Sequence, residues 1–287
     1  MKSLNGKIVF LTGAGSGIGR ALALQLATEG AITMLADISE PALAETLSMI
    51  EARGGRSSIY VLDIRDEQAF QMAAERCIEL HGCVDVLINN AGVLSRNVSF
   101  LEMDVAHQRF VLDVNFWGMV NGCRAFVPLL AIRPQAALVN LASSLAVCGA
   151  PFHSVYCASK AAVLAYSEIM RVELARSPIR ITAVLPGAAK TNLGANVAST
   201  SLEESEKTSK NFDRFATTTP EAVARQIIRG IKRGKARVKT GADGKALVLL
   251  GQLLPVTAHR LMGWTYRKIG DPAQFAYIDG LAQGRHG

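Results

Sequence analysis

The segment 7–19, KIVFLTGAGSGIG, decides the fold class of this chain. Its first half, Lys7–Thr12, is an apolar run typical of a strand that is buried on both faces of a sheet. The second half is rich in glycine, and an apolar periodicity predicts a helix over about 18–29. A glycine-rich turn between a strand and a helix favours binding of a pyrophosphate, because backbone N–H groups and the helix dipole converge there.

The glycine spacing in this turn is specific. The pattern G-x-G-x-x-G does not fit, and the working spacing is Gly13-x-x-x-Gly17-x-Gly19. We expect it to hold a dinucleotide, and the alternative is a plain tight turn. The candidate cofactor-binding residues of the turn are Gly13, Ser16, Gly17, Ile18 and Gly19.

Strands and helices alternate through the rest of the first 185 residues. Apolar runs predict further strands at 32–36, 58–62, 86–88, 137–141 and 179–185. Helices are expected from 40 onward and at 67–80, 104–130 and 154–175. Repeated strand–helix–strand units with such apolar strands predict an α/β fold, in which helices cover both faces of a doubly wound parallel sheet.

Asp37 ends the second predicted strand, 18 residues after Gly19. A carboxylate at this position can accept hydrogen bonds from the ribose hydroxyls of adenosine, and it repels a 2′-phosphate. The positions that could neutralise such a phosphate, Ser16 and Ile38, are not basic. The alternative is a solvated aspartate that caps the turn at 39–41. We therefore predict NAD rather than NADP as the cofactor.

Tyr156-Cys157-Ala158-Ser159-Lys160 lies within the predicted helix 154–175. A spacing of four places the phenol of Tyr156 and the ammonium of Lys160 on one helix face, one turn apart. A phenol, with an ordinary pKa of about 10, becomes a base at neutral pH only beside a cation. Thirteen residues before Tyr156, Ser143 follows strand 137–141, at the edge where open α/β sheets bind ligands. The alternative for Y-x-x-x-K alone is an ordinary amphipathic helix.

Together these motifs resemble the short-chain dehydrogenase/reductase family over about residues 4–195. The matching residues, in the family's order, are Thr12–Gly19, Asp63, Asn89 to Gly92, Asn115, Ser143, Tyr156, Lys160, and Pro186-Gly187 with Thr191. The resemblance implies a Rossmann-fold catalytic domain over 1–235, with a substrate loop at about 187–219. It also implies hydride transfer between NAD(H) and a secondary alcohol or ketone.

The resemblance assigns roles to four catalytic residues. Tyr156 would be the general base for alcohol oxidation and the general acid for carbonyl reduction. Lys160 would lower the pKa of Tyr156 and bind the nicotinamide ribose. Ser143 would stabilise charge that develops on the substrate oxygen. Asn115 would position a water that relays protons to Lys160.

The resemblance also implies contacts to the cofactor and the substrate. Asp63 and Ile64 would flank the adenine, Asn90 the neighbouring ribose, and Thr191 the nicotinamide carboxamide. By family register, the residues lining the substrate pocket would be Val93, Leu94, Phe152, His153 and Leu193. The alternative for each is packing in the core, or a solvated side chain in the case of His153.

Beyond residue 235 the chain departs from the family pattern. The positive net charge of +7 is concentrated in one segment. Residues 225–268 contain 11 Lys and Arg and a single acid, Asp243, and therefore carry +10. The other residues together carry −3. We expect helices at 202–210, 221–233, 247–254 and 256–268, and a short strand at 237–240. Segment 236–287 is thus interpreted as an atypical basic helical extension. Either it contacts an anionic membrane through 247–254 and Trp264, or it covers the substrate cleft or a subunit interface with its charges solvated.

Composition excludes several other classes of protein. A hydrophobic content of 49% excludes disorder. The five cysteines form no C-x-x-C pair and have no clustered histidines, so we expect no metal site and no disulfide framework. No apolar run approaches the ~20 residues of a spanning helix, and no nucleic-acid-binding module accompanies the basic segment. We therefore predict a cytoplasmic enzyme, with peripheral membrane contact as the hypothesis for the extension.

Two alternatives to an NAD-dependent dehydrogenase remain open. One is an NADPH-dependent carbonyl reductase of the same fold, against which Asp37 argues. The other is a non-catalytic dinucleotide sensor, against which the complete set Asn115, Ser143, Tyr156 and Lys160 argues. The family commonly builds subunit contacts from the helices 104–130 and 154–175, so the resemblance implies a homodimer or homotetramer.

Overall fold

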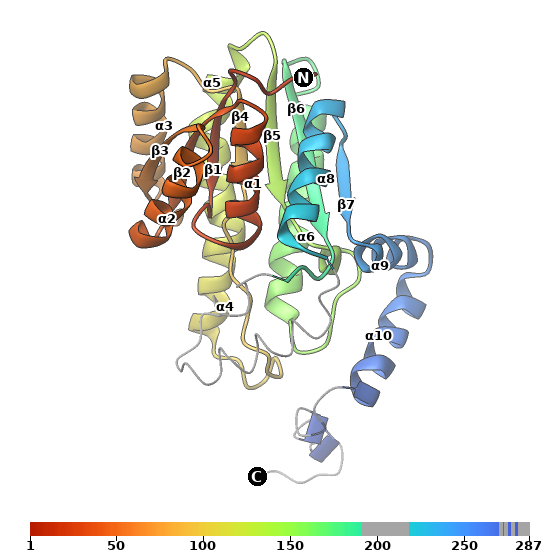
Figure 1. Ribbon diagram of the computed structural model, residues 1–287. Helices are drawn as coiled ribbons and strands as arrows, with labels where there is room; N and C mark the ends of the chain where they lie inside the picture. The colour runs from red at the N-terminus through yellow and green to blue at the C-terminus, as the bar shows by residue number, and fades with distance from the viewer. Residues whose placement is uncertain (191–217, 270–271, 273–274, 277–278, 281–287) are drawn as a thin grey trace.

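A parallel β-sheet forms the centre of the molecule (Figure 1). The computed structural model describes residues 1–190, 218–269, 272, 275–276 and 279–280. Its seven strands run in the order β3-β2-β1-β4-β5-β6-β7, and each neighbouring pair is parallel. The strands are β1 (Ile8–Thr12), β2 (Ile32–Asp37), β3 (Arg56–Val61), β4 (Val86–Asn89), β5 (Ala136–Leu141), β6 (Ile179–Pro186) and β7 (Arg237–Thr240). The predicted doubly wound fold is confirmed, and the strand order reverses between β1 and β4, where such sheets bind ligands.

Helices cover both faces of the sheet because side chains along each buried strand alternate between the faces. Val9 and Leu11 of β1 point into a core shared with α1 (Gly17–Thr28), α2 (Glu40–Glu51) and α8 (Pro220–Arg233). Ile8 and Phe10 point into the opposite core. That second core is formed with α3 (Glu67–His81), α5 (Gly118–Ala131) and α6 (Ser154–Glu173). The helix α4 (Val105–Leu112) packs in a separate cluster, in which Val111 meets Val155 of α6.

The helix predicted over 104–130 is interrupted by a π-helical turn. The turn η1 (Asp113–Trp117) joins α4 to α5 and contains Asn115. A π turn widens the helix by one residue, and such turns often occur at functional sites. The inserted turn brings the buried Asn115 side chain to the chain segment that follows β4.

The sheet continues beyond residue 235, because β7 pairs with β6. A glycine with positive φ, Gly241, follows β7, and α9 (Ala242–Leu253) begins directly after it, five residues earlier than predicted. The helix α10 (Pro255–Ile269) starts at Pro255 and projects from the body of the molecule (Figure 1). Within the described ranges no helix is long and apolar enough to span a membrane. The short helix expected at 202–210 lies outside the described residues.

Candidate active site

The glycine-rich turn after β1 is folded tightly against the end of β4. Gly13 has a φ of +67°, and a Cβ there would lie 2.8 Å from Ala91 Cα. A Cβ on Gly19 would overlap the Gly13 carbonyl oxygen. Ser16 precedes α1 without making a side-chain capping hydrogen bond. The first N–H groups of α1 are therefore not capped by Ser16. An anion-binding helix end requires such uncapped N–H groups.

Asn90 fastens the end of β4 to this turn. Its Nδ2 donates to the carbonyl oxygens of Thr12 at 2.9 Å and of Gly13 at 3.1 Å. In return, Thr12 Oγ1 accepts hydrogen bonds from the N–H groups of Asn90 and Ala91, both at 3.1 Å. Asn90 was expected beside a ribose. Its hydrogen bonds hold together the ends of β1 and β4, the two strands between which the strand order reverses.

Asp37 lies beside the glycine-rich turn. Its Oδ2 accepts from Gly15 N at 2.9 Å, and its Oδ1 accepts from Ser39 N at 3.1 Å. A Cβ on Gly15 would lie 3.0 Å from Asp37 Oδ2. The carboxylate is thus fixed at the carboxyl end of β2, immediately next to the predicted phosphate site.

Arg20, which the sequence interpretation overlooked, is a basic group at the same turn. Its Nη2 donates to Gly15 O at 2.5 Å, and its Nη1 and Nη2 pair with the carboxylate of Glu45 at 2.8 and 2.6 Å. Arg20 stands four residues after Ser16, a spacing that could have pointed to it. Because Glu45 neutralises the guanidinium, Arg20 is engaged within the protein.

Ser143 and Tyr156 meet at the carboxyl end of β5. Ser143 Oγ accepts from Leu145 N at 3.1 Å, and a hydrogen bond between the Ser143 and Tyr156 side chains lowers the pKa of Tyr156. Burial acts more strongly and raises the pKa of Tyr156 to about 12. In the protein by itself the pKa of this phenol is therefore raised, whereas the resemblance implied a lowered one.

Lys160 lies one helical turn beyond Tyr156, with Nζ 5.9 Å from the centroid of the Tyr156 ring. Its Nζ donates to Leu141 O at 3.0 Å, which ties α6 to the end of β5. Burial lowers the pKa of Lys160 to about 8. The ammonium is therefore the main form at neutral pH, and it loses its proton in mild alkali.

Asn115 joins this group from the π turn. Its Nδ2 donates to Val93 O at 2.9 Å and to Ser159 Oγ at 3.0 Å, and its Oδ1 accepts from Val93 N at 2.8 Å. Ser159 Oγ in turn donates to Tyr156 O at 2.7 Å. Ser159, to which the sequence interpretation gave no role, thus connects Asn115 to helix α6. A relaying water could use only the remaining lone pair of Asn115 Oδ1 or the backbone carbonyl.

The residues predicted to line the substrate pocket fall into two groups. Leu94 is buried and packs against Tyr156, whereas Val93 packs in a separate cluster with Met103, Val111 and Val155. Phe152 and His153 immediately precede α6 and are both buried. Thr191 and Leu193, expected at the nicotinamide and in the pocket, lie outside the described residues.

His153 and Phe152 have unusual features for a loop. The Nδ1 atom of His153 is buried without a hydrogen-bond partner, and burial lowers the pKa of this imidazole to about 4. Phe152 has a φ of 65°, a conformation that bulky side chains rarely adopt. Strained residues and unpaired buried polar atoms often mark a ligand-binding surface.

The C-terminal helices pack against this loop. Gly149 N donates to His259 Nε2 of α10 at 3.2 Å, and the rings of Phe152 and Phe275 lie 4.7 Å apart. From α9, Asp243 Oδ2 accepts from Ala188 N at 2.7 Å. The extension therefore contacts the segments that follow β5 and β6.

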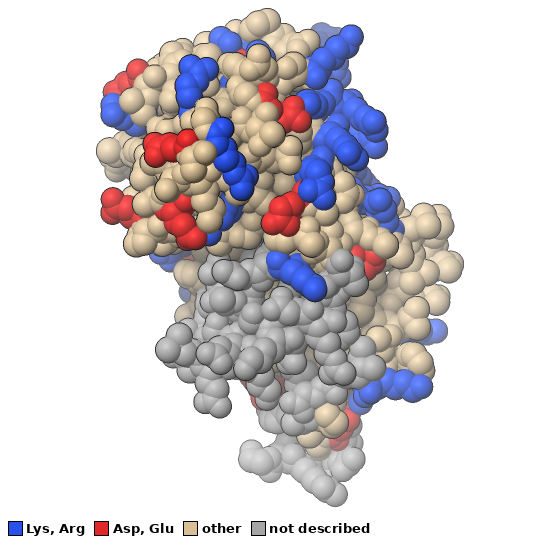
Figure 2. Space-filling view, viewed as in Figure 1, with Lys and Arg blue, Asp and Glu red and all other residues tan. Residues whose placement is uncertain are grey.

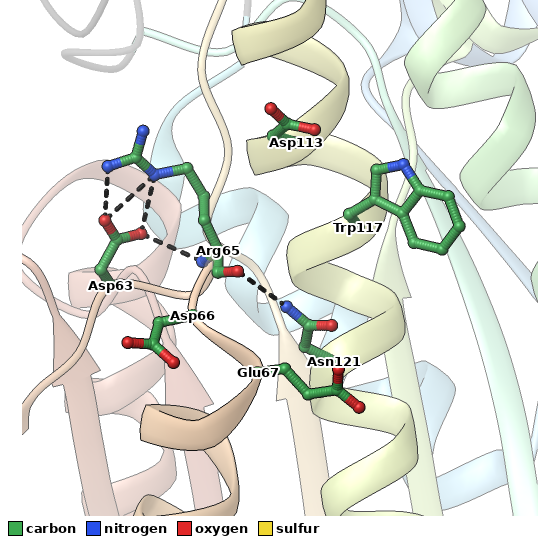
Figure 3. Close-up of a pocket in the computed structure, with 7 residues that line it drawn as sticks. All are labelled: Asp63, Arg65, Asp66, Glu67, Asp113, Trp117 and Asn121. Atoms are coloured by element: carbon green, nitrogen blue, oxygen red, sulfur yellow. Dashed lines mark hydrogen bonds and ion pairs between the residues drawn. The ribbon is translucent and has the colours of Figure 1, made fainter.

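Asp63 and Ile64 lie at the end of β3, beside a cavity of about 530 Å³ (Figure 3). The residues lining the cavity are Asp63, Arg65, Asp66, Glu67, Asp113, Trp117 and Asn121. Both carboxylate oxygens of Asp63 accept hydrogen bonds from Arg65, which lower the pKa of Asp63. Asn121 Nδ2 holds Ile64 O at 3.0 Å. An adenine bound here would have to share the carboxylate oxygens of Asp63, as hydrogen-bond acceptors, with Arg65.

Comparison with known proteins identifies a family for this chain. The family described as short chain dehydrogenase matches residues 7–202. SadH of Mycobacterium tuberculosis, named as an oxidoreductase, is 35% identical over 266 residues, which cover 91% of this chain and 96% of SadH. A short chain dehydrogenase/reductase from Burkholderia phymatum, crystallised with NAD, is 27% identical with a TM-score of 0.81, covering 87% of this chain and 94% of its own. The SadH match covers more of this chain than residues 1–235 comprise, so part of the C-terminal extension has a counterpart there.

Proposed function

Because this chain belongs to the short-chain dehydrogenase/reductase family of oxidoreductases, we propose that it transfers a hydride between NAD(H) and a secondary alcohol or its ketone. The observation that carries the proposal is the convergence of Ser143, Tyr156 and Lys160 at the carboxyl end of β5. The structural relative from Burkholderia phymatum was crystallised with NAD, which supports a nicotinamide dinucleotide as cofactor.

The residues around the glycine-rich turn fit such a cofactor. Gly13 and Gly19 leave no room for a side chain, and the uncapped start of α1 offers N–H groups to a pyrophosphate. When bound, the nicotinamide ring accepts or supplies the hydride. The tasks of this chain's residues are to bind and orient the reactants and to move the accompanying proton.

Tyr156 is the residue proposed to move that proton. With a pKa of about 12 its phenol is protonated at neutral pH, as a general acid for carbonyl reduction requires. For alcohol oxidation the phenolate must be favoured, and the charges of Lys160 and of an oxidised nicotinamide both act in that direction. Proton transfer in either direction therefore depends on the Lys160 ammonium, which Leu141 O holds in place.

Ser143 is proposed to bind the substrate oxygen. Its Oγ already accepts a hydrogen bond from Leu145 N, which leaves the hydroxyl proton available for donation. Donation to an oxygen that gains negative charge during hydride transfer stabilises the transition state. His153, with its unpaired buried Nδ1, is proposed as a further polar contact to the substrate.

Support for NAD over NADP comes from Asp37 and the Arg20–Glu45 pair. Asp37 would stand beside the adenosine ribose and repel a 2′-phosphate. Arg20 is the basic group that could oppose this effect, but Glu45 occupies its guanidinium. An NADPH-dependent reductase is therefore disfavoured by two independent contacts.

A homo-oligomer is proposed through α5 and α6. On α6, Ile169 is 60% exposed and Val172 is 70% exposed. Large apolar side chains on adjacent turns of a surface helix are typical of subunit interfaces. Sedimentation velocity of the protein and of a Val172→Glu variant would test the assembly, because the added charge should shift it towards monomer.

The proposed reaction is tested with a Tyr156→Phe variant. It should bind NAD as tightly as the wild type in a fluorescence titration, yet lose at least about a thousandfold in turnover on a secondary-alcohol panel monitored by NADH absorbance. Undiminished turnover would overturn the mechanism. Binding of NADP more tightly than NAD by the wild type would overturn the cofactor assignment.

A further inference from the structure

The outer face of α9 and α10 exposes large apolar side chains to solvent. On α9, Leu249 and Leu253 lie one turn apart and are 55% and 69% exposed. On α10, Leu261 and Trp264 share a face and are 49% and 56% exposed. We call this surface the outer apolar face; its members are Leu249, Leu253, Leu254, Val256, Leu261 and Trp264.

These helices bury few large side chains against the body of the molecule and expose several. The residues that α9 buries are Gly244, Val248 and Gly251, and α10 buries Ala258. Gly244, Val248 and Gly251 thus face the body of the molecule, where Gly251 fits against Cys148, while Leu249, Leu253 and Leu254 face outward and Leu247 and Leu250 are half-buried. Exposed leucines contribute hydrophobic stabilisation only when an apolar surface outside the protein core covers them.

The border of the outer apolar face is cationic. Residues 244–268 include Lys245, Arg260, Arg267 and Lys268 and no acid. Arg267 is neutralised by Asp279, which accepts from it at 3.0 and 3.1 Å, so the cationic side chains of the border are Lys245, Arg260 and Lys268. The nearest preceding acid, Asp243, is directed inward to Ala188 N. Lys268 Nζ lies 4.5 Å from the centroid of the Trp264 ring. In Figure 2 the region of α9 and α10 is mostly uncharged, with blue side chains at its edge.

We infer that the outer apolar face binds the surface of an anionic lipid bilayer. An amphipathic helix with tryptophan and leucine on one side and basic residues at the border is typical of helices that lie in the headgroup region. Trp264 with Lys268 above its ring provides the amphipathic pair suited to that depth. The basic side chains add attraction for anionic lipids.

The charge distribution favours a bilayer over a second copy of the chain. In a two-fold contact the same surface meets itself, so the basic borders of two copies would face one another. An anionic bilayer instead meets this border with opposite charge.

Bilayer binding would have a defined orientation relative to the active site. The inner side of α10 contacts the loop before α6, where Gly149 N donates to His259 Nε2. The outer apolar face lies on the other side of the same helices. The bilayer would therefore face the C-terminal side of the molecule, next to the loop that carries Phe152 and His153.

Vesicle binding of the full chain tests this inference without cofactor or substrate, so it is independent of the proposed reaction. Phosphatidylcholine vesicles with and without about 30% phosphatidylglycerol would be sedimented with wild type, Leu253→Glu and Ile132→Glu. Ile132 is 81% exposed after α5 and precedes Arg133, which pairs with Asp85 directly before β4. It therefore lies at the amino end of the strands, whereas α9 follows the carboxyl end of β7, and it matches Leu253 in the charge added. A Trp117→Phe background leaves Trp264 as the single tryptophan reporter.

We expect wild type and Ile132→Glu to bind the anionic vesicles equally, with a blue shift of Trp264 emission, and to release at about 1 M salt. Leu253→Glu should bind at least about tenfold more weakly. Equal binding of the two variants, or no binding by the wild type, would overturn the inference. Self-association that Leu253→Glu abolishes, without vesicle binding, would assign the face to a second copy instead. Circular dichroism confirms that the variants remain folded.

Discussion

Asn115 forms two hydrogen bonds with the backbone of Val93, one from Val93 N to Oδ1 at 2.8 Å and one from Nδ2 to Val93 O at 2.9 Å. A third bond, from Nδ2 to Ser159 Oγ, reaches helix α6. Asn115 therefore ties the loop after β4 to the helix that carries Tyr156 and Lys160, and the π turn is what brings it there.

Replacing Asn115 with alanine should impair both stability and turnover. The buried groups of Val93 and Ser159 lose their partner, which should cost about 2–3 kcal/mol in the free energy of unfolding. Turnover should fall about a hundredfold as the geometry between Val93 and α6 loosens. Urea denaturation and steady-state kinetics measure the two effects.

Asn121→Ala is the matched control for this substitution. Asn121 is also buried in the same continuous helix, and its Nδ2 donates to Ile64 O and Arg65 O, away from Tyr156. It should lose stability similarly but retain turnover at saturating cofactor. A comparable loss of turnover in both variants would show that Asn115 has only a structural role.

Gly92 separates Asn115 from Lys160, and an alanine there should disturb both. Its Cβ would lie 2.9 Å from Asn115 Oδ1 and 3.1 Å from Lys160 Nζ. Asn115 is fixed by its hydrogen bonds, so Lys160 should be displaced, and kcat should fall at least about tenfold. Gly263→Ala, where a Cβ would meet nothing within 4 Å, is the control. Unchanged kinetics of Gly92→Ala would contradict this close approach.

Cofactor preference should shift when the carboxylates near the glycine-rich turn are removed. Asp37→Ser removes the group that would repel a 2′-phosphate, and Glu45→Gln frees the Arg20 guanidinium to pair with one. We expect each change to raise the affinity for NADP relative to NAD by about tenfold, and the double variant to raise it further.

Fluorescence titration with both dinucleotides measures that shift. Glu51→Gln, an exposed residue at the end of α2, removes the same charge away from Arg20 and should leave the ratio unchanged. An equal shift in Glu51→Gln would attribute the effect to net charge, and no shift in Glu45→Gln would exclude a role for Arg20.

Much of this structure could be predicted from local patterns. Continuous apolar runs located β1, β2 and β4–β6 to within about two residues, because buried parallel strands have no polar face to obscure them. Ser143, Tyr156 and Lys160 were predicted as a group because they stand at fixed distances along helix α6 and after β5, whereas Asn115 was predicted from the family resemblance alone. These features depend on neighbours in sequence.

The remaining features depend on partners distant in sequence. The π turn at Asn115 leaves no trace in a 3.6-residue periodicity. The Arg20–Glu45 pair joins residues 25 positions apart, and Ser159 gains its role only through Asn115. The raised pKa of Tyr156 follows from burial, which motif spacing does not report. For α9 and α10, composition suggested two faces, but which side packs on the body was decided by the tertiary fold.

His153 should make the stability of this protein depend on pH. Burial lowers the pKa of this imidazole to about 4, against an ordinary value of 6.5 in the unfolded chain. Between these values the unfolded state binds a proton that the folded state does not. The contribution of neutral, buried His153 to the free energy of unfolding should therefore be fully present above pH 6.5. It should be lost as the pH falls towards 4, which lowers the free energy of unfolding by about 3 kcal/mol.

A His153→Gln variant isolates this contribution, because other titrating groups affect both proteins alike. Urea denaturation at about pH 7 and about pH 5 should show wild type losing about 2 kcal/mol more than the variant between the two conditions. The same variant should raise KM for the substrate with little change in kcat, as expected for a residue that contacts substrate without moving the proton. Identical pH dependence in the two proteins would mean that His153 is solvated, and its unpaired Nδ1 would then lose its significance for the substrate pocket.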